Sequence, residues 1–222
     1  MSAYIWGFST RIFHLFLVMF IIITWISADG DYLQIHSAFG YAIGVLILFR
    51  LIWGLMGPKY SHFKDFNFSI KKALAFSKNF FNNHEKHLGH NPAASLILFI
   101  LLIVILFIVL TGVLALGAQE AKGVFASLNL TSFKELKLFE DIHEIAANTM
   151  LVLICAHLAG LLMDWFFHKE EGTLLSIVKG SKNIKGEDAK MNFFQAIIAF
   201  LFFVLMLFSL YFTFANLPLL YS

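Results

Sequence analysis

Five long apolar stretches, separated by polar segments, divide this chain of 222 residues. A helix needs about 20 apolar residues to cross a hydrocarbon core of ~30 Å, and each stretch is long enough. We therefore predict membrane-spanning helices over about residues 8–28, 34–56, 92–116, 141–166 and 192–214. Pro58 follows the second stretch and Pro92 opens the third, where proline ends and begins helices. The pattern predicts an all-α integral membrane bundle.

The polar segments carry weaker signals of structure. Within 58–92, apolar residues recur at helical spacing over 66–83 with lysines between them, which predicts an amphipathic helix at the membrane interface. We expect short helical pieces within 117–140. No small-residue cleavage site follows the first apolar stretch, so we interpret it as a retained helix rather than a signal peptide. We expect a four-helix domain over residues 1–185 and a fifth, C-terminal helix within 186–222.

Composition supports a membrane protein. Hydrophobic residues make up 59% of the chain and charged residues 14%, whereas a soluble domain is about a quarter charged. We expect lipid to surround it and no nucleic acid to bind it. The single cysteine, Cys155, excludes a disulfide framework and the Cys-x-x-Cys-His motif that attaches c-type haem.

The basic residues favour one orientation. If the N-terminus lies in the cytoplasm, that side holds Arg11, the six lysines of 58–92 and the five of 168–190. The other side then holds only Lys122, Lys134 and Lys137, among several acidic residues. An excess of Lys and Arg marks the cytoplasmic side, so we expect a multi-pass protein of the bacterial inner membrane with a periplasmic C-terminus.

Four histidines lie inside the predicted spans. His143 and His157 are fourteen residues apart, almost four whole turns, so both project from the same helix face about 21 Å apart. An imidazole in lipid usually marks a site. The alternating directions of the helices place His36 at the depth of His143, near the outer face, and His14 at the depth of His157, near the inner face.

Two facing imidazoles fit the axial positions of a haem iron better than a structural zinc site, which takes four ligands. A bis-histidine haem has no open position and favours electron transfer. Gly40 and Gly44 lie below His36 on its own face, where they leave room for a macrocycle or, equally, for a close helix contact. Arg50, with Arg11 as the weaker candidate, would pair with a haem propionate or extend to lipid headgroups.

The remaining histidines and the four tryptophans have simpler interpretations. His62, His84, His87, His90 and His168 are expected to be solvated surface histidines, although His87 and His90 have a spacing that could bind metal. Trp6, Trp25, Trp53 and Trp165 fall near helix ends and are expected to be interfacial anchors.

Several motifs together resemble one family. They are Arg11-Ile-Phe-His14, the run from His36-Ser-Ala-Phe-Gly-Tyr to Arg50-Leu-Ile-Trp-Gly-Leu-Met-Gly-Pro58, Gly89-His-Asn-Pro92, and the two histidines of the fourth span. Over about residues 6–185 the chain resembles the prokaryotic di-haem b-type cytochromes, which include bacterial cytochrome b561, the cytochrome b of nickel-iron hydrogenases and the gamma subunit of formate dehydrogenase.

The resemblance implies two haems b, an outer one on His36 and His143 and an inner one on His14 and His157. It also implies electron transfer between quinone and a periplasmic redox partner, either a hydrogenase or a c-type cytochrome, and some members form dimers. Two alternatives stay open. One is a stand-alone quinone-linked oxidoreductase that acts on a diffusible oxidant, and the other is a haem-free membrane anchor or transporter.

Overall fold

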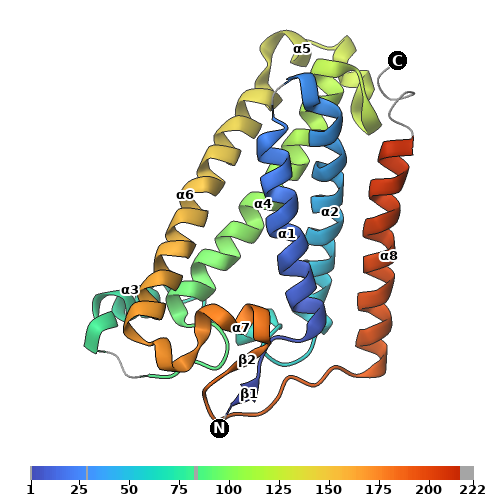
Figure 1. Ribbon diagram of the computed structural model, residues 1–222. Coiled ribbons are helices and arrows are strands. Elements are labelled where there is room, and N and C mark those ends of the chain that lie inside the picture. Colours follow the sequence, from blue (N-terminus) through green and yellow to red (C-terminus); the bar gives the residue numbers. More distant parts are fainter. Residues whose placement is uncertain (1, 29, 83–84, 216–222) are drawn as a thin grey trace. The chain divides into compact units, whose positions relative to one another are not determined.

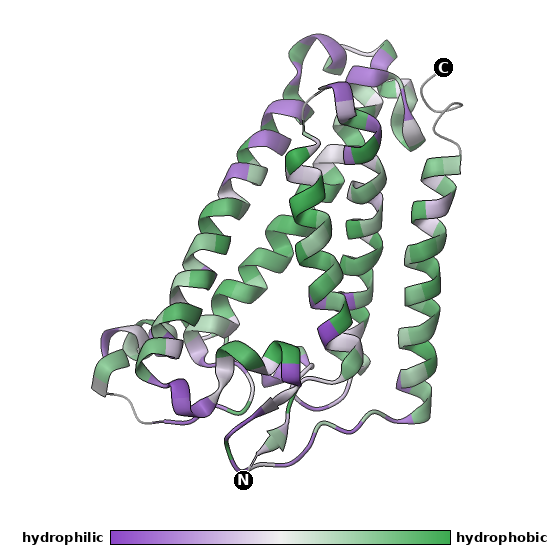
Figure 2. Cartoon of the chain, in the orientation of Figure 1, coloured by the Kyte–Doolittle hydropathy of each residue, from purple (hydrophilic) through white to green (hydrophobic). Residues whose placement is uncertain are grey.

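The computed structural model describes residues 2–28, 30–82 and 85–215, and its long elements are helices (Figure 1). Within these described ranges, five helices are long and apolar enough to cross a membrane. They are α1 (Phe8–Ile26), α2 (Leu33–Met56), α4 (Pro92–Glu120), α6 (Leu138–Phe167) and α8 (Phe193–Ala215). Figure 2 shows hydrophobic colouring along these helices and hydrophilic colouring in the segments that connect them. The prediction of an all-α membrane protein with five spans is confirmed.

Helix limits follow local chemistry. α4 runs four residues further than expected, to Glu120, because the Asn129 amide donates hydrogen bonds to the carbonyls of Ala118 and Gln119 (2.8 and 3.2 Å). These carbonyls would otherwise lack a partner at the helix end. α6 begins at Leu138, where Lys137 adopts a left-handed conformation that separates it from α5 (Phe133–Leu136).

Short helices occupy the connections, as expected for 117–140. They are η1 (Gly30–Tyr32), η2 (Phe63–Asp65), α3 (Ile70–Lys78), η3 (Phe80–Asn82), η4 (Gly123–Leu130), α5, η5 (Lys169–Glu171) and α7 (Thr173–Lys179). Of the segment 66–83, where we expected an amphipathic helix, only α3 is an α-helix. It is capped at its N-terminus by the Ser69 side chain, which accepts a hydrogen bond from the Lys72 amide. Ile70 and Leu74 are exposed beside the lysines of α3. Asp29 and His84 lie outside the described residues.

The chain forms two compact units, and each long helix contributes to both. Unit 1 comprises Met1–His14, Arg50–Leu101 and Val152–Ala199. Its short sheet, which sequence reasoning did not predict, pairs β1 (Ala3–Tyr4) with β2 (Ser181–Lys182) in antiparallel register (Figure 1). The Ala189 amide donates to the Tyr4 carbonyl (2.7 Å), so the chain before α1 is tied to the segment before α8.

Two of the four tryptophans are not interfacial anchors, which corrects the prediction for them. Trp6 and Trp53 are 7% and 2% exposed, and both use their indole N–H inside unit 1. Trp6 donates to Ser176 Oγ (2.9 Å) and Trp53 to Thr10 Oγ1 (3.3 Å). Buried indoles need such partners, and these bonds fix the start of α1 against α7 and α2. Trp25 and Trp165 are each 44% exposed, as an anchor requires.

Unit 2 comprises Leu15–Phe49, Leu102–Leu151 and Phe200–Ser222. Phe20, only 1% exposed, packs between Phe16 and Phe39, with ring centres 5.5 and 5.0 Å away. Phe16 and Phe39 in turn contact Phe203 and Phe214 of α8. Aromatic rings in edge-on and tilted contact therefore join α1, α2 and α8 in this unit.

Candidate functional site

Two of the four intramembrane histidines meet in unit 2. The imidazole of His36, on α2, and that of His143, on α6, have ring centres 6.0 Å apart and planes inclined at 78°. Both side chains are partly buried. This is the pair that the helix directions predict.

A backbone carbonyl orients each imidazole of this pair. His36 Nδ1 lies 2.8 Å from the Thr24 carbonyl oxygen, and His143 Nδ1 lies 3.0 Å from that of Ile108. A carbonyl oxygen can only accept, so each Nδ1 carries the proton and donates it. Nε2 of each neutral ring is then the atom with a free lone pair. Metal-binding histidines usually have this second hydrogen bond, which fixes the tautomer and the ring orientation.

The two carbonyls are available for different reasons. Thr24 lies in the last turn of α1, where carbonyls have no partner within the helix. Ile108 lies inside α4, where the Thr111 hydroxyl also donates to its carbonyl (3.1 Å). His143 can approach the α4 backbone because residue 112 is glycine. A Cβ at Gly112 would lie 2.9 Å from His143 Cε1, closer than real side chains come.

The two glycines of α2 have different surroundings. A Cβ at Gly44 would lie 3.2 Å from Val109 Cγ1, so this glycine permits a close contact with α4. A Cβ at Gly40 would meet nothing within 4 Å. Of the two interpretations that the sequence left open, Gly44 therefore fits the helix contact. Gly40 borders open space one turn along α2 from His36, and this space suits a flat ligand.

His14 and His157 belong to unit 1. His14 lies on α1 and His157 on α6, both are partly buried, and the two side chains lie near enough to interact electrostatically. The structure thus brings together the second pair as well. Among the described residues, no group of three or more His, Cys, Asp or Glu side chains could hold a metal ion.

The two arginines lie in unit 1 too. Arg50 donates to the Ser61 carbonyl (3.2 Å), and its guanidinium lies over the rings of Phe63 and Phe66 (4.8 and 5.6 Å to the centroids). Arg11 donates from one Nη to the Val178 carbonyl (2.6 Å), while its Nε is buried without a hydrogen-bond partner. A buried N–H without a partner suggests that a further acceptor binds there.

His90 is not a solvated surface histidine, which corrects the prediction. Its ring lies between those of Trp6 and Phe66, with centroids 4.8 and 4.9 Å away. Burial, with the nearby charges of Arg50 and Lys182, lowers the pKa of His90 to about 3. His90 is therefore neutral at physiological pH, and it interacts electrostatically with His157.

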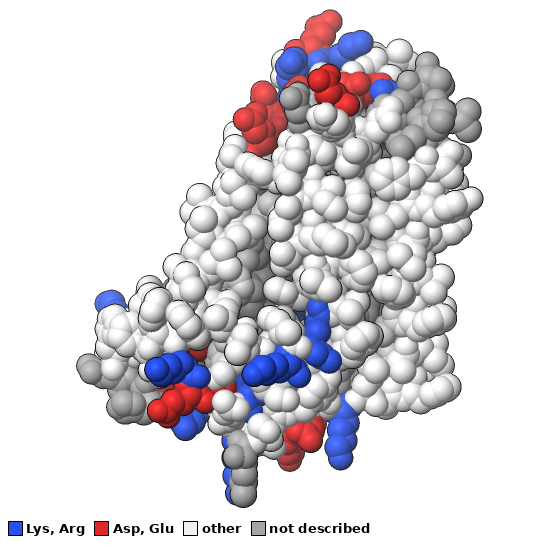
Figure 3. Space-filling model, viewed as in Figure 1, with Lys and Arg blue, Asp and Glu red and all other residues white. Residues whose placement is uncertain are grey.

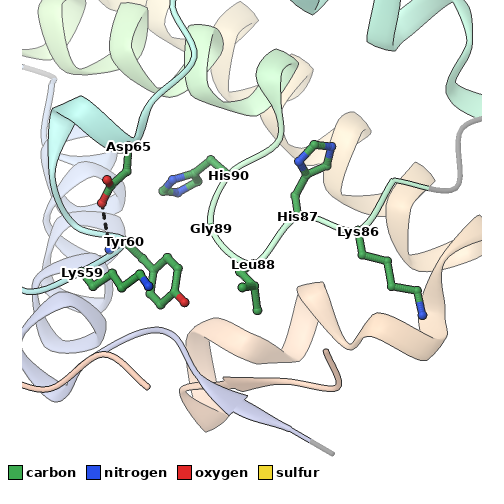
Figure 4. Close-up of a pocket in the computed structure, with 8 residues that line it drawn as sticks. All are labelled: Lys59, Tyr60, Asp65, Lys86, His87, Leu88, Gly89 and His90. Atoms are coloured by element: carbon green, nitrogen blue, oxygen red, sulfur yellow. Dashed lines mark hydrogen bonds between the residues drawn. The ribbon is translucent and has the colours of Figure 1, made fainter. Parts of the chain in front are cut away.

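His87 is also partly buried, against the ring of Phe76, and burial lowers its pKa. The side chains of His62 and His168 are partly exposed, so the prediction of solvated histidines is wrong for His90 and His87 and is not contradicted for His62 and His168. The rings of Phe66, Phe76 and Phe80 lie against His90, His87 and His168, and helical periodicity alone gave no sign of these contacts. His87 and His90 line a cavity of about 320 Å³ with Lys59, Tyr60, Asp65, Lys86, Leu88 and Gly89 (Figure 4).

The geometry of the His36–His143 pair fits a metal ion held between two imidazoles. Metal–nitrogen bonds of about 2 Å, with about 1 Å from each nitrogen to its ring centre, separate the ring centres by about 6 Å. The observed separation is 6.0 Å. With open space at Gly40 and both Nδ1 atoms engaged, the residues fit a bis-histidine haem. The fold and these side chains define a membrane protein of the cytochrome b class.

Comparison with known proteins agrees. The family model of prokaryotic cytochrome b561 matches residues 5–180, most of the chain, and the chain belongs to this family. It is a membrane protein that binds haem b and transfers electrons. No curated protein and no solved structure shows a significant match to the chain.

The imidazole of His90, which lies between Trp6 and Phe66, should make stability depend on pH. As pH falls below about 6.5, His90 becomes protonated in the unfolded chain. In the folded chain its pKa is about 3, so it stays neutral until the pH is much lower. Stability supplied by neutral His90 is thus present above 6.5 and is lost on acidification. In the wild type this loss should be about 1 kcal/mol of unfolding free energy for each pH unit between 6 and 4. We expect His90→Phe to abolish this contribution to the pH dependence. Thermal unfolding midpoints of both proteins, followed from pH 7 to 4, measure it.

The matched control is His62→Phe, a histidine of the same unit outside the Trp6–Phe66 stack. This variant should keep the pH dependence of the wild type. If His90→Phe and the wild type lose stability in parallel on acidification, the pKa of His90 is not lowered in the folded state.

Proposed function

We propose that this cytochrome carries electrons across the bacterial inner membrane between a periplasmic redox partner and the quinone pool, through two haems b. His36 and His143 hold the outer haem, and His14 and His157 hold the inner one. The observation that carries the proposal is the pair of Nδ1–carbonyl hydrogen bonds at His36 and His143, which direct both free Nε2 lone pairs away from the backbone. A haem held by two histidines would supply single-electron transfer rather than the binding of a further ligand.

At the outer site the protein orients the two imidazoles and leaves space for a haem. The carbonyls of Thr24 and Ile108 hold the two imidazoles as neutral donors at Nδ1, which increases the basicity of Nε2. Gly112 admits the His143 ring, and Gly40 leaves the face of α2 open beside His36.

At the inner site, Arg11 and Arg50 belong to the same unit as His14 and His157 and would supply positive charge there. Arg50 faces the aromatic rings of η2 and its flank, and Arg11 has a buried Nε without a partner. A carboxylate accepts strong hydrogen bonds from guanidinium groups, so both arginines suit haem propionates. Arg11 lies one turn before His14 on α1, which brings it beside the ligand that it would serve.

A haem count tests the ligand assignment. We expect two haems b per chain in the wild type, one in His143→Ala and one in His157→Ala, and none in the double variant. Gly112→Val, which presses on the His143 ring, should resemble His143→Ala. Reduced-minus-oxidised spectra and extracted-haem assays of purified protein measure this.

His62→Ala serves as the control in the haem count and should keep both haems. Two haems in His157→Ala, with a wild-type spectrum, would contradict the assignment of the inner ligands.

The orientation rests on charge. The lysine-rich connections 58–92 and 168–190 face the cytoplasm in this proposal, and Figure 3 shows charged atoms gathered over the connecting segments. Trypsin should cut these segments in inverted membrane vesicles and leave them intact in spheroplasts. The reverse pattern of cutting would overturn the orientation.

The periplasmic partner would dock on the segment between α4 and α6. This segment and the first turns of α6 expose Glu135, Glu140, Asp141 and Glu144, and Leu130 there is 91% exposed. These four acidic residues outnumber the exposed Lys134 and Lys137 of the same segment, so the surface is complementary to a basic electron-transfer protein and would speed its approach. The quinone reacts near the inner haem, at the opposite face of the membrane.

Quinol oxidation tests the redox role. In purified wild-type protein, a short-chain quinol should reduce both haems, whereas in His157→Ala it should reduce the remaining haem much more slowly, because its electrons enter through the inner site. Stopped-flow absorbance at the haem bands measures the rate. Equal rates in wild type, His143→Ala and His157→Ala would contradict the assigned route. If no short-chain quinol reduces the haems of the wild type, the proposed electron transfer with quinone is wrong.

A further inference from the structure

A cluster of charged and titratable side chains lies in unit 1 apart from the haem ligands. Asp164, near the end of α6, has a side chain that is only 14% exposed. Its Oδ1 lies 3.7 Å from His168 Nδ1, and its Oδ2 is buried without a hydrogen-bond partner. A carboxylate oxygen in this state is costly, so buried examples call for an explanation.

His87 supplies the second unpartnered atom. Its Nε2 is buried without a hydrogen-bond partner, and the side chain interacts electrostatically with Asp164, Lys182 and Glu85. Carboxyl and imidazole groups are the two kinds of side chain that most readily exchange protons near neutral pH. Neither atom has a hydrogen-bond partner, so the two groups are not bonded to each other, and a proton would pass between them through intervening water.

Lys182 fixes the electrostatics of this cluster. It is 3% exposed, and its Nζ donates hydrogen bonds to the carbonyls of His87 and Gly89 (2.9 and 3.0 Å). Its charge acts on both Asp164 and Glu171. These bonds hold the His87 backbone in place against β2.

The cluster reaches solvent in two directions. His87 lines the cavity of about 320 Å³, together with Tyr60, Asp65 and the exposed lysines at its edge (Figure 4). Glu171 is partly exposed, and burial together with the charge of Asp164 raises its pKa, against the opposite effects of Lys182, His168 and Lys86. A carboxyl group with a raised pKa binds and releases protons at a higher pH than an ordinary carboxyl group does.

The sequence gives Asp164 a defined direction. It follows His157 by seven residues on the uninterrupted helix α6, about 20° short of two whole turns, so both side chains project from the same face. The carboxyl group therefore lies on the side of the helix that bears the inner ligand, about 10 Å along the axis.

We propose that Asp164 and His87 form the site that exchanges protons between cytoplasmic water and the quinone that reacts at the inner haem. The inference rests on the proposed function. Reduction of one quinone to quinol takes two electrons, which a bound inner haem would supply one at a time, and two protons. The protons pass through Asp164 and His87 and are replaced from water by way of Glu171 or the cavity. Quinol oxidation releases two protons along the same groups.

The main test is Asp164→Asn in the purified holoprotein. The haem count and haem spectrum should stay those of the wild type, and reduction by a one-electron dye that carries no proton should keep its rate. Reduction by a short-chain quinol should slow about 10²-fold and lose its dependence on pH between 5 and 8. Asp164→Glu, which restores a carboxyl group, should recover most of the rate.

Glu170→Gln is the matched control, because this exposed carboxyl group adjoins Glu171 in sequence without belonging to the cluster. It should behave as the wild type in every assay. An infrared difference spectrum of reduced minus oxidised protein gives an independent readout, in which a protonated-carboxyl band should be present in the wild type and absent in Asp164→Asn.

The outcomes separate the two proposals. If quinol fails to reduce the wild type, the proposed quinone link fails, whatever the variants show. If quinol reduces the wild type and Asp164→Asn equally fast with the same pH profile, the proton site is overturned and the quinone link stands. If dye and quinol reactions of Asp164→Asn slow by the same factor, Asp164 has only a structural role.

Discussion

The hydrogen bond from a histidine Nδ1 to a backbone carbonyl is the interaction on which the rest of this structure depends. In a membrane a neutral imidazole needs a partner for its N–H, and water cannot supply one. His36 takes the Thr24 carbonyl at the end of α1, and His143 takes the Ile108 carbonyl within α4. Each bond fixes a tautomer and ties a helix to its neighbour, so ligand geometry and helix packing are set together. The approach of His143 to a continuous helix explains why α4 carries glycine at position 112.

Much of this could be predicted from the sequence. The five spans follow from the length and hydropathy of the apolar runs, because a bilayer permits few other structures. The pairing of His36 with His143 follows from helix direction alone. The second partners could not be predicted, since any carbonyl at the right depth would serve a histidine equally well. Gly112 and Thr111 had no periodic signal that set them apart from ordinary residues of an apolar helix.

The connecting segments were harder to predict for another reason. A loop rich in Lys, His and Phe normally lies in solvent, and the histidines within it were expected to do so. In unit 1, however, Trp6 and Phe66 enclose His90, and β1 and β2 pair segments that are about 180 residues apart. Such long-range packing leaves no local pattern. One signal was available, because Asp164 follows His157 at two helical turns and so belongs on the same buried face of α6.

α6 thus places three ionisable side chains on one face at intervals of fourteen and seven residues: His143, His157 and Asp164. A carboxyl group on this face is costly in an apolar surrounding unless its charge is offset, and Lys182 offers that charge from β2. The lysine is itself held by the carbonyls of His87 and Gly89, just before the Asn91-Pro92 start of α4. The Gly89-His90-Asn91-Pro92 motif therefore has a physical role that its sequence does not reveal. The Gly89 carbonyl accepts a hydrogen bond from Lys182, and His90 is the neutral imidazole that interacts with His157. Pro92 begins the membrane span α4.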